Sequence, residues 1–321
     1  MSEEILVSVI CTAYNHEKYI RSALDGFVMQ KTSFPFEVLI NDDASTDGTA
    51  AIIREYAEKY PDIIVPVYQT ENQYSKNVSI ISNILLPMAR GKYIAFCEGD
   101  DYWTDENKLQ MQIDFLESHS DYIACVHNTT FKDCSGKSRD KLVVERNDEH
   151  DVIFEDVIFG MKNAYQTSSL TVRREVFSNL PDFCHIADKH GFGDYPNAIW
   201  FTIISKIRFL PYNMSTYRFM STSQSWSAST YTRTNLIKHN KVLIEILQAV
   251  KSHVSEERCN LLDKVILEQE YNNVELDRRF SELKRPEFQE IWKNKPLLYK
   301  IKIYVKQHFP WLYKILGNVK E

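Results

Sequence analysis

Acidic side chains are concentrated in one short stretch, "CEGDDYWTD" at positions 97–105. It follows "KYIAFC", an apolar run that predicts a buried strand. Carboxylates at this density repel one another unless water or a cation screens them. Glu98 and Asp100 are two residues apart and point to one side of an extended chain, whereas Asp101 points to the other unless Gly99 turns it. The stretch is therefore either a candidate site for a divalent cation or a solvated acidic loop that caps a helix.

A second acidic cluster has the same position relative to a predicted strand. Asp42 and Asp43 lie in "NDDASTDGT", at the end of the apolar run 36–42. The first predicted strand, 5–12, also ends in a polar turn, "TAYNHEKY". Ligands of open parallel α/β sheets bind beyond the carboxyl ends of the strands, so we expect the three turns to share one crevice. A negative crevice suits a phosphate that arrives with Mn²⁺ or Mg²⁺, which bind carboxylate and phosphate oxygens together.

The chain that positions these turns alternates strand and helix patterns over roughly its first 130 residues. Pro66 restricts the third strand to a sheet edge or a bulge, and Ser45 or Thr46 is placed to cap the second helix. This alternation predicts an α/β fold, a Rossmann-like, mostly parallel sheet flanked by helices. The expected strands are 5–12, 36–42, 63–69, 92–97 and 122–127.

The alternation loosens after about residue 150, and from about residue 234 the chain becomes helical and charged. No stretch rich in Gly, Pro or Ser separates these parts of the sequence. We expect an α/β domain at 1–228 and a helical C-terminal region at 229–321.

Composition narrows the class of protein. A net charge of −6 and a pI near 5.9 give no general attraction for nucleic acid. The N-terminus lacks the order of a signal peptide, and no apolar run approaches the roughly 20 residues that span a bilayer. Cysteines without C-x-x-C spacing argue against a zinc site or disulfides and for a reducing compartment. We therefore expect a cytoplasmic protein, or one peripheral on the inner face of the cell membrane. The cysteines are Cys11, Cys97, Cys125, Cys134, Cys184 and Cys259.

The stretch 295–320 mixes aliphatic and aromatic residues with six lysines and no acid. Pro310 would break or kink a helix there. Two short basic amphipathic helices on an anionic membrane surface would explain this pattern. A helix packed on the body of the protein, with a solvated lysine face, explains it equally well.

Taken together and in order, these motifs resemble family 2 glycosyltransferases of the GT-A fold, in particular bacterial enzymes that build capsule, lipopolysaccharide or other surface glycans. The resemblance covers about residues 5 to 228. Each motif alone is weak, and the ordered set is specific. The motifs are "VSVICTAYNHEKYIRSAL", "VLINDDASTDGTAAII", "ARGKYIAFCEGDDYWTDENKLQMQIDFLE" and "GDYP…YR".

The resemblance implies a role for each polar strand end. The acid pair Asp42 and Asp43 would contact the base and ribose of a nucleotide-diphosphate sugar, with UDP the expected nucleotide. The second acidic motif would handle metal, ribose and diphosphate; Asp100 and Asp101 would hold Mn²⁺ or Mg²⁺. The full set of expected donor-binding residues is Thr12, Ala13, Tyr14, Asp42, Asp43, Glu98, Asp100 and Arg218.

Asp194, in "HGFGDYP", matches the family's catalytic base. An acceptor hydroxyl must lose its proton as it attacks the anomeric carbon, so a carboxylate is needed opposite the leaving diphosphate. A structural alternative is that Asp194 caps the apolar helix that follows it, and we favour the base. Arg218 could pair with the diphosphate or form a surface salt bridge. The acceptor is expected near 166–169 and 219–228.

The sequence departs from the family pattern in three places. Glu98 replaces the usual aspartate, Ala44 stands where glycine is frequent, and Met220 replaces a frequent histidine. The Gln-x-x-Arg-Trp motif of processive synthases is absent. We expect an inverting, metal-dependent, non-processive glycosyltransferase that acts on a glycan or lipid-linked saccharide in cell-surface polysaccharide synthesis. A sugar nucleotidyltransferase and a non-catalytic nucleotide- or glycan-binding scaffold are the alternatives.

Overall fold

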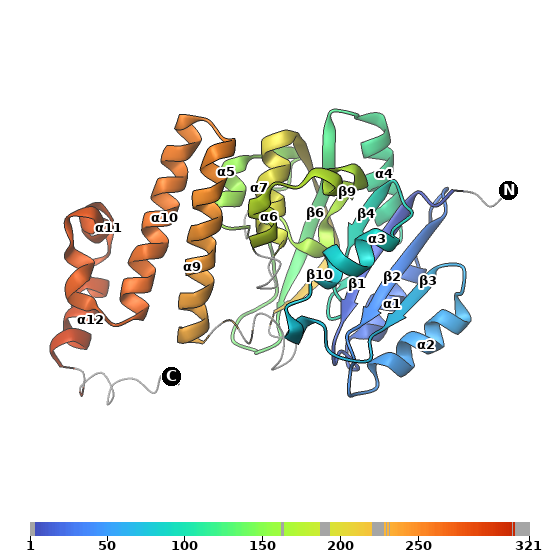
Figure 1. Cartoon of the computed structure of the whole chain (residues 1–321), viewed down its shortest axis with the longest axis horizontal. Helices are drawn as coiled ribbons and strands as arrows, with labels where there is room; N and C mark the ends of the chain where they lie inside the picture. The colour runs from blue at the N-terminus through green and yellow to red at the C-terminus, as the bar shows by residue number, and fades with distance from the viewer. Residues whose placement is uncertain are drawn as a thin grey trace. The chain divides into compact units, whose positions relative to one another are not determined.

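The computed structural model describes residues 4–161, 164–186, 193–219, 228, 230, 232–309 and 311 (Figure 1). The chain forms two compact units, residues 1–223 and 224–321. The expected functional division at 228/229 stays a prediction.

Unit 1 is built on one continuous sheet with helices packed against it (Figure 1), which confirms the α/β prediction. The strand order is β3-β2-β1-β4-β9-β6-β10-β5, parallel from β3 to β4 and again between β6 and β10. β9 runs antiparallel to both its neighbours. The strands on this path are β1 Val7–Ala13, β2 Phe36–Asp42, β3 Ile64–Tyr68, β4 Tyr93–Phe96, β5 Tyr102–Trp103, β6 Tyr122–Asp133, β9 Thr171–Arg173 and β10 Lys206–Phe219.

Two short strands and seven α-helices complete the described part of unit 1. β7 Lys141–Leu142 pairs with β6, and β8 His150–Val152 pairs with β10. The helices are α1 Ile20–Val28, α2 Thr49–Lys59, α3 Leu86–Met88, α4 Lys108–Ser118, α5 Phe154–Ile158, α6 Asp182–Ile186 and α7 Asp194–Ile204.

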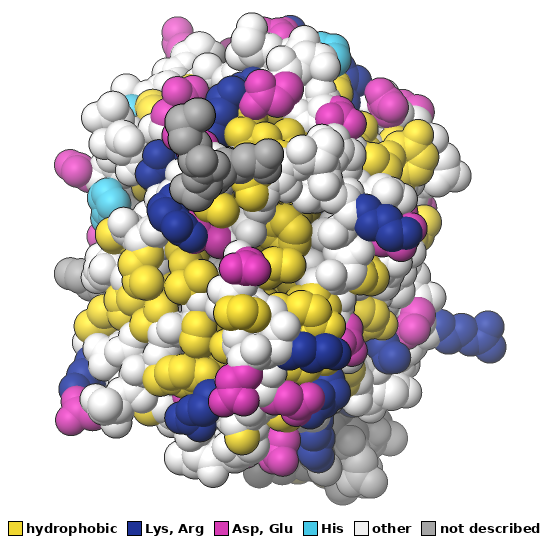
Figure 2. Space-filling view, turned by 90° about the vertical axis from the view of Figure 1, so that its right-hand side faces the viewer, with side chains coloured by type: hydrophobic (Ala, Val, Ile, Leu, Met, Phe, Trp, Pro, Cys, Tyr) yellow, Lys and Arg dark blue, Asp and Glu magenta, His cyan; other side chains and the backbone are white. Residues whose placement is uncertain are grey.

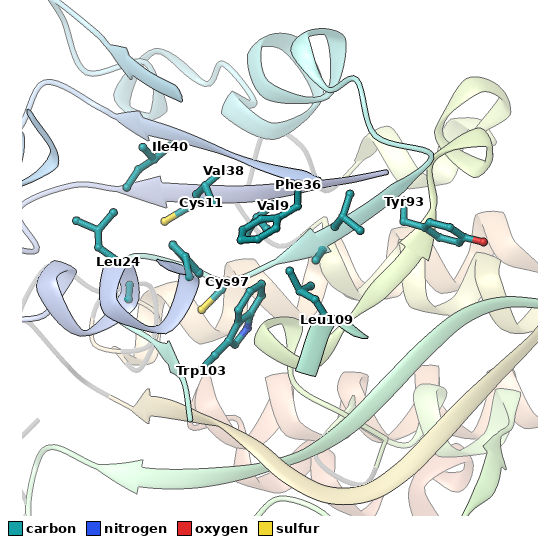
Figure 3. Packing of buried hydrophobic residues seen from close by; sticks show 14 of the residues in the cluster. Val9, Cys11, Leu24, Phe36, Val38, Ile40, Tyr93, Cys97, Trp103 and Leu109 are labelled. Atoms are coloured by element: carbon teal, nitrogen blue, oxygen red, sulfur yellow. The ribbon is translucent and has the colours of Figure 1, made fainter. Parts of the chain in front are cut away.

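The core of unit 1 lies between the first strands and the helices α1 and α4. Val9 and Cys11 on β1 pack with Leu24 of α1, Trp103 of β5 and Leu109 of α4 (Figure 3). β1 and β2 are buried almost throughout because both faces of the sheet are covered. The core therefore fixes the carboxyl ends of these strands against one another.

The structure confirms one expectation about the strands and helices of unit 1 and corrects two others. β3 is an edge strand, as Pro66 predicts. Neither Ser45 nor Thr46 caps the second helix, which begins at Thr49 with Gly48 as its N-cap. Ser45 and Thr46 instead bond to Asn15 in the turn after β1. β6 extends six residues past the expected 122–127, because β10 pairs along its length.

All six cysteines are free thiols. Cys11, Cys97 and Cys125 are buried in or beside strands, as expected for small core residues. On the face of the molecule in Figure 2, basic and acidic side chains among the described residues are interspersed.

Unit 2 is helical, with its own apolar cluster. Thr232 and Ser255 cap its two long helices through side-chain oxygens that accept from Asn235 and Arg258 backbone N–H groups. Among the described residues, no helix has the length and apolar character that crossing a bilayer requires. The helices are α9 Arg233–Val250, α10 Glu256–Leu276, α11 Gln289–Asn294 and α12 Leu297–His308, and the cluster contains Tyr271, Val274, Phe280, Leu283, Phe288 and Ile303.

Candidate active site

The ends of β1, β2 and β4 are joined by two backbone hydrogen bonds. Asp43 N–H, after β2, donates to Ala13 O at 2.9 Å, and Gly99 N–H, after β4, donates to Thr12 O at 2.9 Å. A Cβ at position 99 would lie 2.8 Å from Ile20 Cδ1 and 3.0 Å from His16 Nδ1. Glycine is therefore what allows the acidic loop to approach the first turn this closely.

The acid pair after β2 is buried, and its two members do different work. Both oxygens of Asp43 accept backbone N–H groups of the loop after β3, from Gln73 at 2.7 Å and Tyr74 at 3.1 Å. Asp42 accepts Ser45 N–H through Oδ2 at 3.3 Å, and its buried Oδ1 has no protein partner within the described chain. Asp43 thus orders a loop, whereas Asp42 Oδ1 is a buried acceptor that forms no hydrogen bond within the described chain.

The turn after β1 depends on a residue that the sequence analysis did not single out. Asn15 has a left-handed backbone, with φ of 54°. Its N–H donates to Ser45 Oγ at 2.9 Å, and its Oδ1 accepts Thr46 N–H at 2.8 Å. Asparagine tolerates this backbone better than most residues. In the sequence, the signal for this role was an asparagine in the polar turn "TAYNHEKY" after the first predicted strand. The bonds hold the Thr12–Tyr14 turn against the loop after β2.

Burial and mutual repulsion dominate the electrostatics of the second acidic motif. The pKa of Glu98 is raised to about 7, first by burial and then by the charges of Asp100 and Asp194. Burial, followed by the charges of Asp100 and Glu98, raises the pKa of Asp101. Negative charge is therefore crowded into a poorly solvated space, an arrangement that a bound cation would relieve.

Arg218, on β10, is fastened to this loop. Its backbone N–H donates to Asp101 Oδ1 at 2.8 Å, and its Nη1 donates to Asp100 O at 2.6 Å. The guanidinium lies over the ring of Tyr102, 4.2 Å from the centroid, and 5.0 Å from that of Tyr19. These contacts are possible because β5 pairs antiparallel with β10. Arg218 is therefore held against the acidic loop, with its guanidinium beside the rings of Tyr19 and Tyr102.

Asp194 is the first residue of α7 and faces the same region. Its Oδ1 accepts Tyr195 N–H at 2.9 Å, and its Oδ2 accepts Thr167 Oγ1–H at 3.4 Å. Asp194 is exposed at the protein surface, and desolvation by the protein on its other sides raises its pKa. The effect of its charge on the pKa of Glu98 links it to the acidic loop. Gly193 is the N-cap of α7 and no side chain caps the helix, so Asp194 lies in the first turn without capping it. Its role as the base stays a prediction.

The expected acceptor segment 166–169 lies beside Asp194. Thr167 contacts that carboxylate, and Ser168 O accepts the indole N–H of Trp103 at 2.8 Å. The other expected acceptor segment falls mostly at 220–227, outside the described residues. Met220 and Trp226 lie there too.

Tyr217 is a further residue that the sequence analysis missed. Burial raises its pKa, and the charges of four carboxylates add to that shift, those of Asp101, Asp100, Glu98 and Asp194. One phenol is thus within electrostatic range of both the acidic loop and the expected base. Its only sequence signal was its place beside Arg218.

Metal binding can be tested against the donor set. Within the described chain, no three His, Cys, Asp or Glu side chains form a ready-made metal cage. Mg²⁺ is commonly held by one or two carboxylates with substrate phosphates and water, so such a cage is not required. The crowded carboxylates after β4 are suitable hard oxygen ligands. The residues therefore fit a cation that binds together with a diphosphate.

Comparison with solved structures supports the fold. The Staphylococcus aureus TarS 1–349 structure in complex with UDP has a TM-score of 0.59 and 18% identity, covering 90% of this chain and 78% of that one. Mannosyltransferase PcManGT from Pyrobaculum calidifontis, in complex with GDP-Man and Mn²⁺, has a TM-score of 0.54 and 13% identity, covering 98% and 84%. Both likenesses are at the level of the GT-A fold.

Comparison with known sequences identifies the family as well as the fold. The Mycobacterium tuberculosis "Uncharacterized protein Rv1520" is 36% identical over 216 residues, and the match spans 66% of this chain and 58% of that protein's length. The Escherichia coli "UDP-Glc:alpha-D-GlcNAc-diphosphoundecaprenol beta-1,3-glucosyltransferase WfaP" is 35% identical over 113 residues, 35% of this chain and 42% of that one. The model of "Glycosyl transferase family 2" matches residues 8–180, more than half of the chain. The protein therefore belongs to glycosyltransferase family 2.

Proposed function

We propose that the protein transfers a sugar from a nucleotide-diphosphate sugar to a glycan or lipid-linked saccharide in cell-surface polysaccharide synthesis. The observation that carries this proposal is the placement of Asp194 within electrostatic range of Glu98, in a chain of family 2. In this proposal, a donor-binding acidic loop and an acid that deprotonates the acceptor share one site. The names of relatives, such as the glucosyltransferase WfaP, favour the same process.

In this proposal the donor's nucleoside binds beyond β1 and β2. Asp42 offers its unpartnered Oδ1 to a base or ribose donor group. The turn of Thr12, Ala13 and Tyr14 lines the pocket, and Asp43 contributes by ordering the loop at 73–74. The UDP complex of TarS makes UDP the first nucleotide to test.

Asp100 and Asp101 would hold Mn²⁺ or Mg²⁺, with Glu98 beside them. When bound, such an ion offsets the negative charge of a departing nucleoside diphosphate. Arg218 adds a fixed positive charge, since its guanidinium is held by Asp100 O and by Tyr102. Because Asp101 accepts the Arg218 backbone N–H, it also fixes the arginine relative to the acidic loop.

Asp194 acts as the general base. The acceptor oxygen forms a bond to the anomeric carbon and passes its proton to the Asp194 carboxylate. The bond between that carbon and the donor phosphate oxygen breaks, and its electron pair leaves with the diphosphate. Attack opposite the leaving group inverts the anomeric carbon. Desolvation makes Asp194 a stronger base than a solvated aspartate, and Thr167 orients its Oδ2.

Asp194→Asn tests this assignment. We expect it to reduce transfer at least about 100-fold, the scale of lost general-base catalysis, while UDP-sugar and Mn²⁺ still raise the melting temperature. Asp182→Asn is the matched control, because Asp182 also begins a helix, α6, and is exposed. Both variants lose one charge at a helix N-terminus.

Three outcomes would overturn parts of the proposal. Full transfer by Asp194→Asn would remove the base assignment. Failure of every nucleotide to shift melting, with and without Mn²⁺, would remove the donor site. Full biological activity of a chain that transfers no sugar would indicate a scaffold.

A further inference from the structure

The last described helix, α12, is apolar on two opposite sides. Ile303 points into the cluster of unit 2 and is 1% exposed, and Tyr299 donates its hydroxyl to Glu275 Oε2 at 2.6 Å. On the other side, Leu297 is 71% and Leu298 80% exposed. One apolar side is thus satisfied within unit 2, and the other faces outward.

The outward side is a continuous stripe. Leu297, Ile301 and Tyr304 are four and three residues apart, which places them on one helix face. Ile301 is 49% and Tyr304 55% exposed. Just beyond the helix, Phe309 and Trp311 are exposed as well. We call the set of Leu297, Leu298, Ile301, Tyr304, Phe309 and Trp311 the outer face.

Lysines flank the outer face. At 100° per residue, Lys300 and Lys302 lie on opposite flanks of the stripe. Lys302 is exposed, and Lys300 donates to Lys293 O at 3.0 Å, beside the ring of Trp292. The sequence from 291 to 320 contains seven lysines and no aspartate or glutamate. The outer face therefore suits an occupant that is apolar and carries negative charge.

We propose that the outer face lies in the interfacial layer of an anionic lipid bilayer. Leucine, isoleucine and aromatic side chains would enter the boundary between headgroups and acyl chains, and flanking lysines would meet lipid phosphates. At 12 residues, α12 is about 18 Å long, too short to cross and suited to lie in the plane. The proposal goes beyond sugar transfer and does not depend on it.

A second copy of the chain is the less suitable occupant. A two-fold contact through the outer face would place the same surface on both partners, so the lysine flanks would oppose one another. Like charges at close range disfavour that contact. An anionic surface, in contrast, gains from every lysine that reaches it.

The test is co-sedimentation of the full chain with vesicles. One set is equimolar phosphatidylglycerol and phosphatidylcholine, and the other is phosphatidylcholine alone. We expect binding to the anionic set that weakens at 0.5 M salt. The double variant Leu298→Ser/Ile301→Ser should lower the partition constant at least about tenfold, and Lys302→Gln about fivefold.

The matched control is Leu142→Ser/Ile153→Ser, which removes the same two side chains from exposed positions in unit 1. It should bind as the unaltered chain does. Equal melting temperatures will show that the α12 variant is folded, as expected for exposed positions. The proposal is overturned if the chain does not bind anionic vesicles at low salt. It is also overturned if the chain binds neutral vesicles equally well, or if the α12 substitutions leave binding unchanged. A concentration-dependent dimer that only the α12 variant loses, in sedimentation velocity without lipid, would also overturn it.

Discussion

Ala44 follows the buried acid pair and has φ of 58°, a left-handed backbone that suits glycine. For an alanine this backbone costs about 1–2 kcal/mol. Glycine would remove the strain but lose more entropy on folding, by about 0.4–1 kcal/mol. We predict that Ala44→Gly raises the free energy of unfolding by about 0.5–1 kcal/mol, the difference between these terms, as measured by urea denaturation.

Asn77 provides the control for that experiment. Its φ is 59°, but asparagine tolerates the left-handed region. Asn77→Gly should therefore change stability less than Ala44→Gly does. If the two variants shift the midpoint of urea denaturation equally, or if Ala44→Gly is destabilising, backbone strain at Ala44 does not determine the change in stability.

Residue types predicted which polar side chains meet at the strand ends, but not what each one holds. The position of Asp42 and Asp43 after a strand was readable, because strand ends share one edge of the sheet. The binding of Asp43 to the loop at 73–74 was not readable. That bond depends on the path of a loop some 30 residues away, which no local pattern encodes.

At the scale of elements, α4 carries a buried lysine. Lys108, its first residue, lies with Nζ 3.3 Å from Thr171 Oγ1 and 3.9 Å from the centroid of a Trp103 ring. Burial lowers its pKa from 10.5 to about 7. Between these two values the unfolded chain holds a proton that the folded chain has released. Stability therefore rises with pH across this window, by up to about 1.4 kcal/mol per unit.

Lys108→Met removes this contribution. Relative to the variant, the unaltered chain should gain up to about 2.7 kcal/mol of unfolding free energy between pH 7 and 9. Urea denaturation at both pH values measures the difference. Lys18→Met, at an exposed lysine, should leave the pH dependence unchanged. Parallel curves for the unaltered chain and Lys108→Met would show that Lys108 keeps its proton when folded.

The strands and helices of the first half of the chain were predictable from local patterns, as was the helical character from about residue 234, but the strands after about residue 150 were not. Strands β1 to β4 are apolar runs between helices, and local periodicity identifies them. β9 has three residues, and β10 is a long strand with register shifts where it pairs with β6. Pairing partners more than 80 residues apart leave little local signal, so Arg218 could be proposed from a motif but not placed on a strand.

At the scale of the whole molecule, the cysteines of both units can be used to measure how each unit opens. Cys11, Cys97, Cys125 and Cys184 are buried in unit 1. Burial raises the thiol pKa of Cys11 and Cys97, and nearby carboxylates add to the shift. Cys134 is exposed, and Cys259 is the sole cysteine of unit 2. The thiolate is the form of cysteine that reacts with a labelling reagent, and a buried thiol reacts only after the surrounding chain opens. The labelling rates of the buried cysteines therefore measure the opening of unit 1.

We predict that UDP-sugar with Mn²⁺, at about 100 times its dissociation constant, slows labelling of the four buried thiols by up to about 100-fold, because it binds only the folded site. Labelling of Cys134 should not change, which controls for reagent chemistry. Cys259 should also keep its rate, because its unit has a separate core and contains none of the proposed donor-binding residues. Peptide mapping by mass spectrometry reads each cysteine separately. Slowing of Cys259 to the same degree would show that the two units open together, and unchanged rates throughout would show that the donor does not bind unit 1.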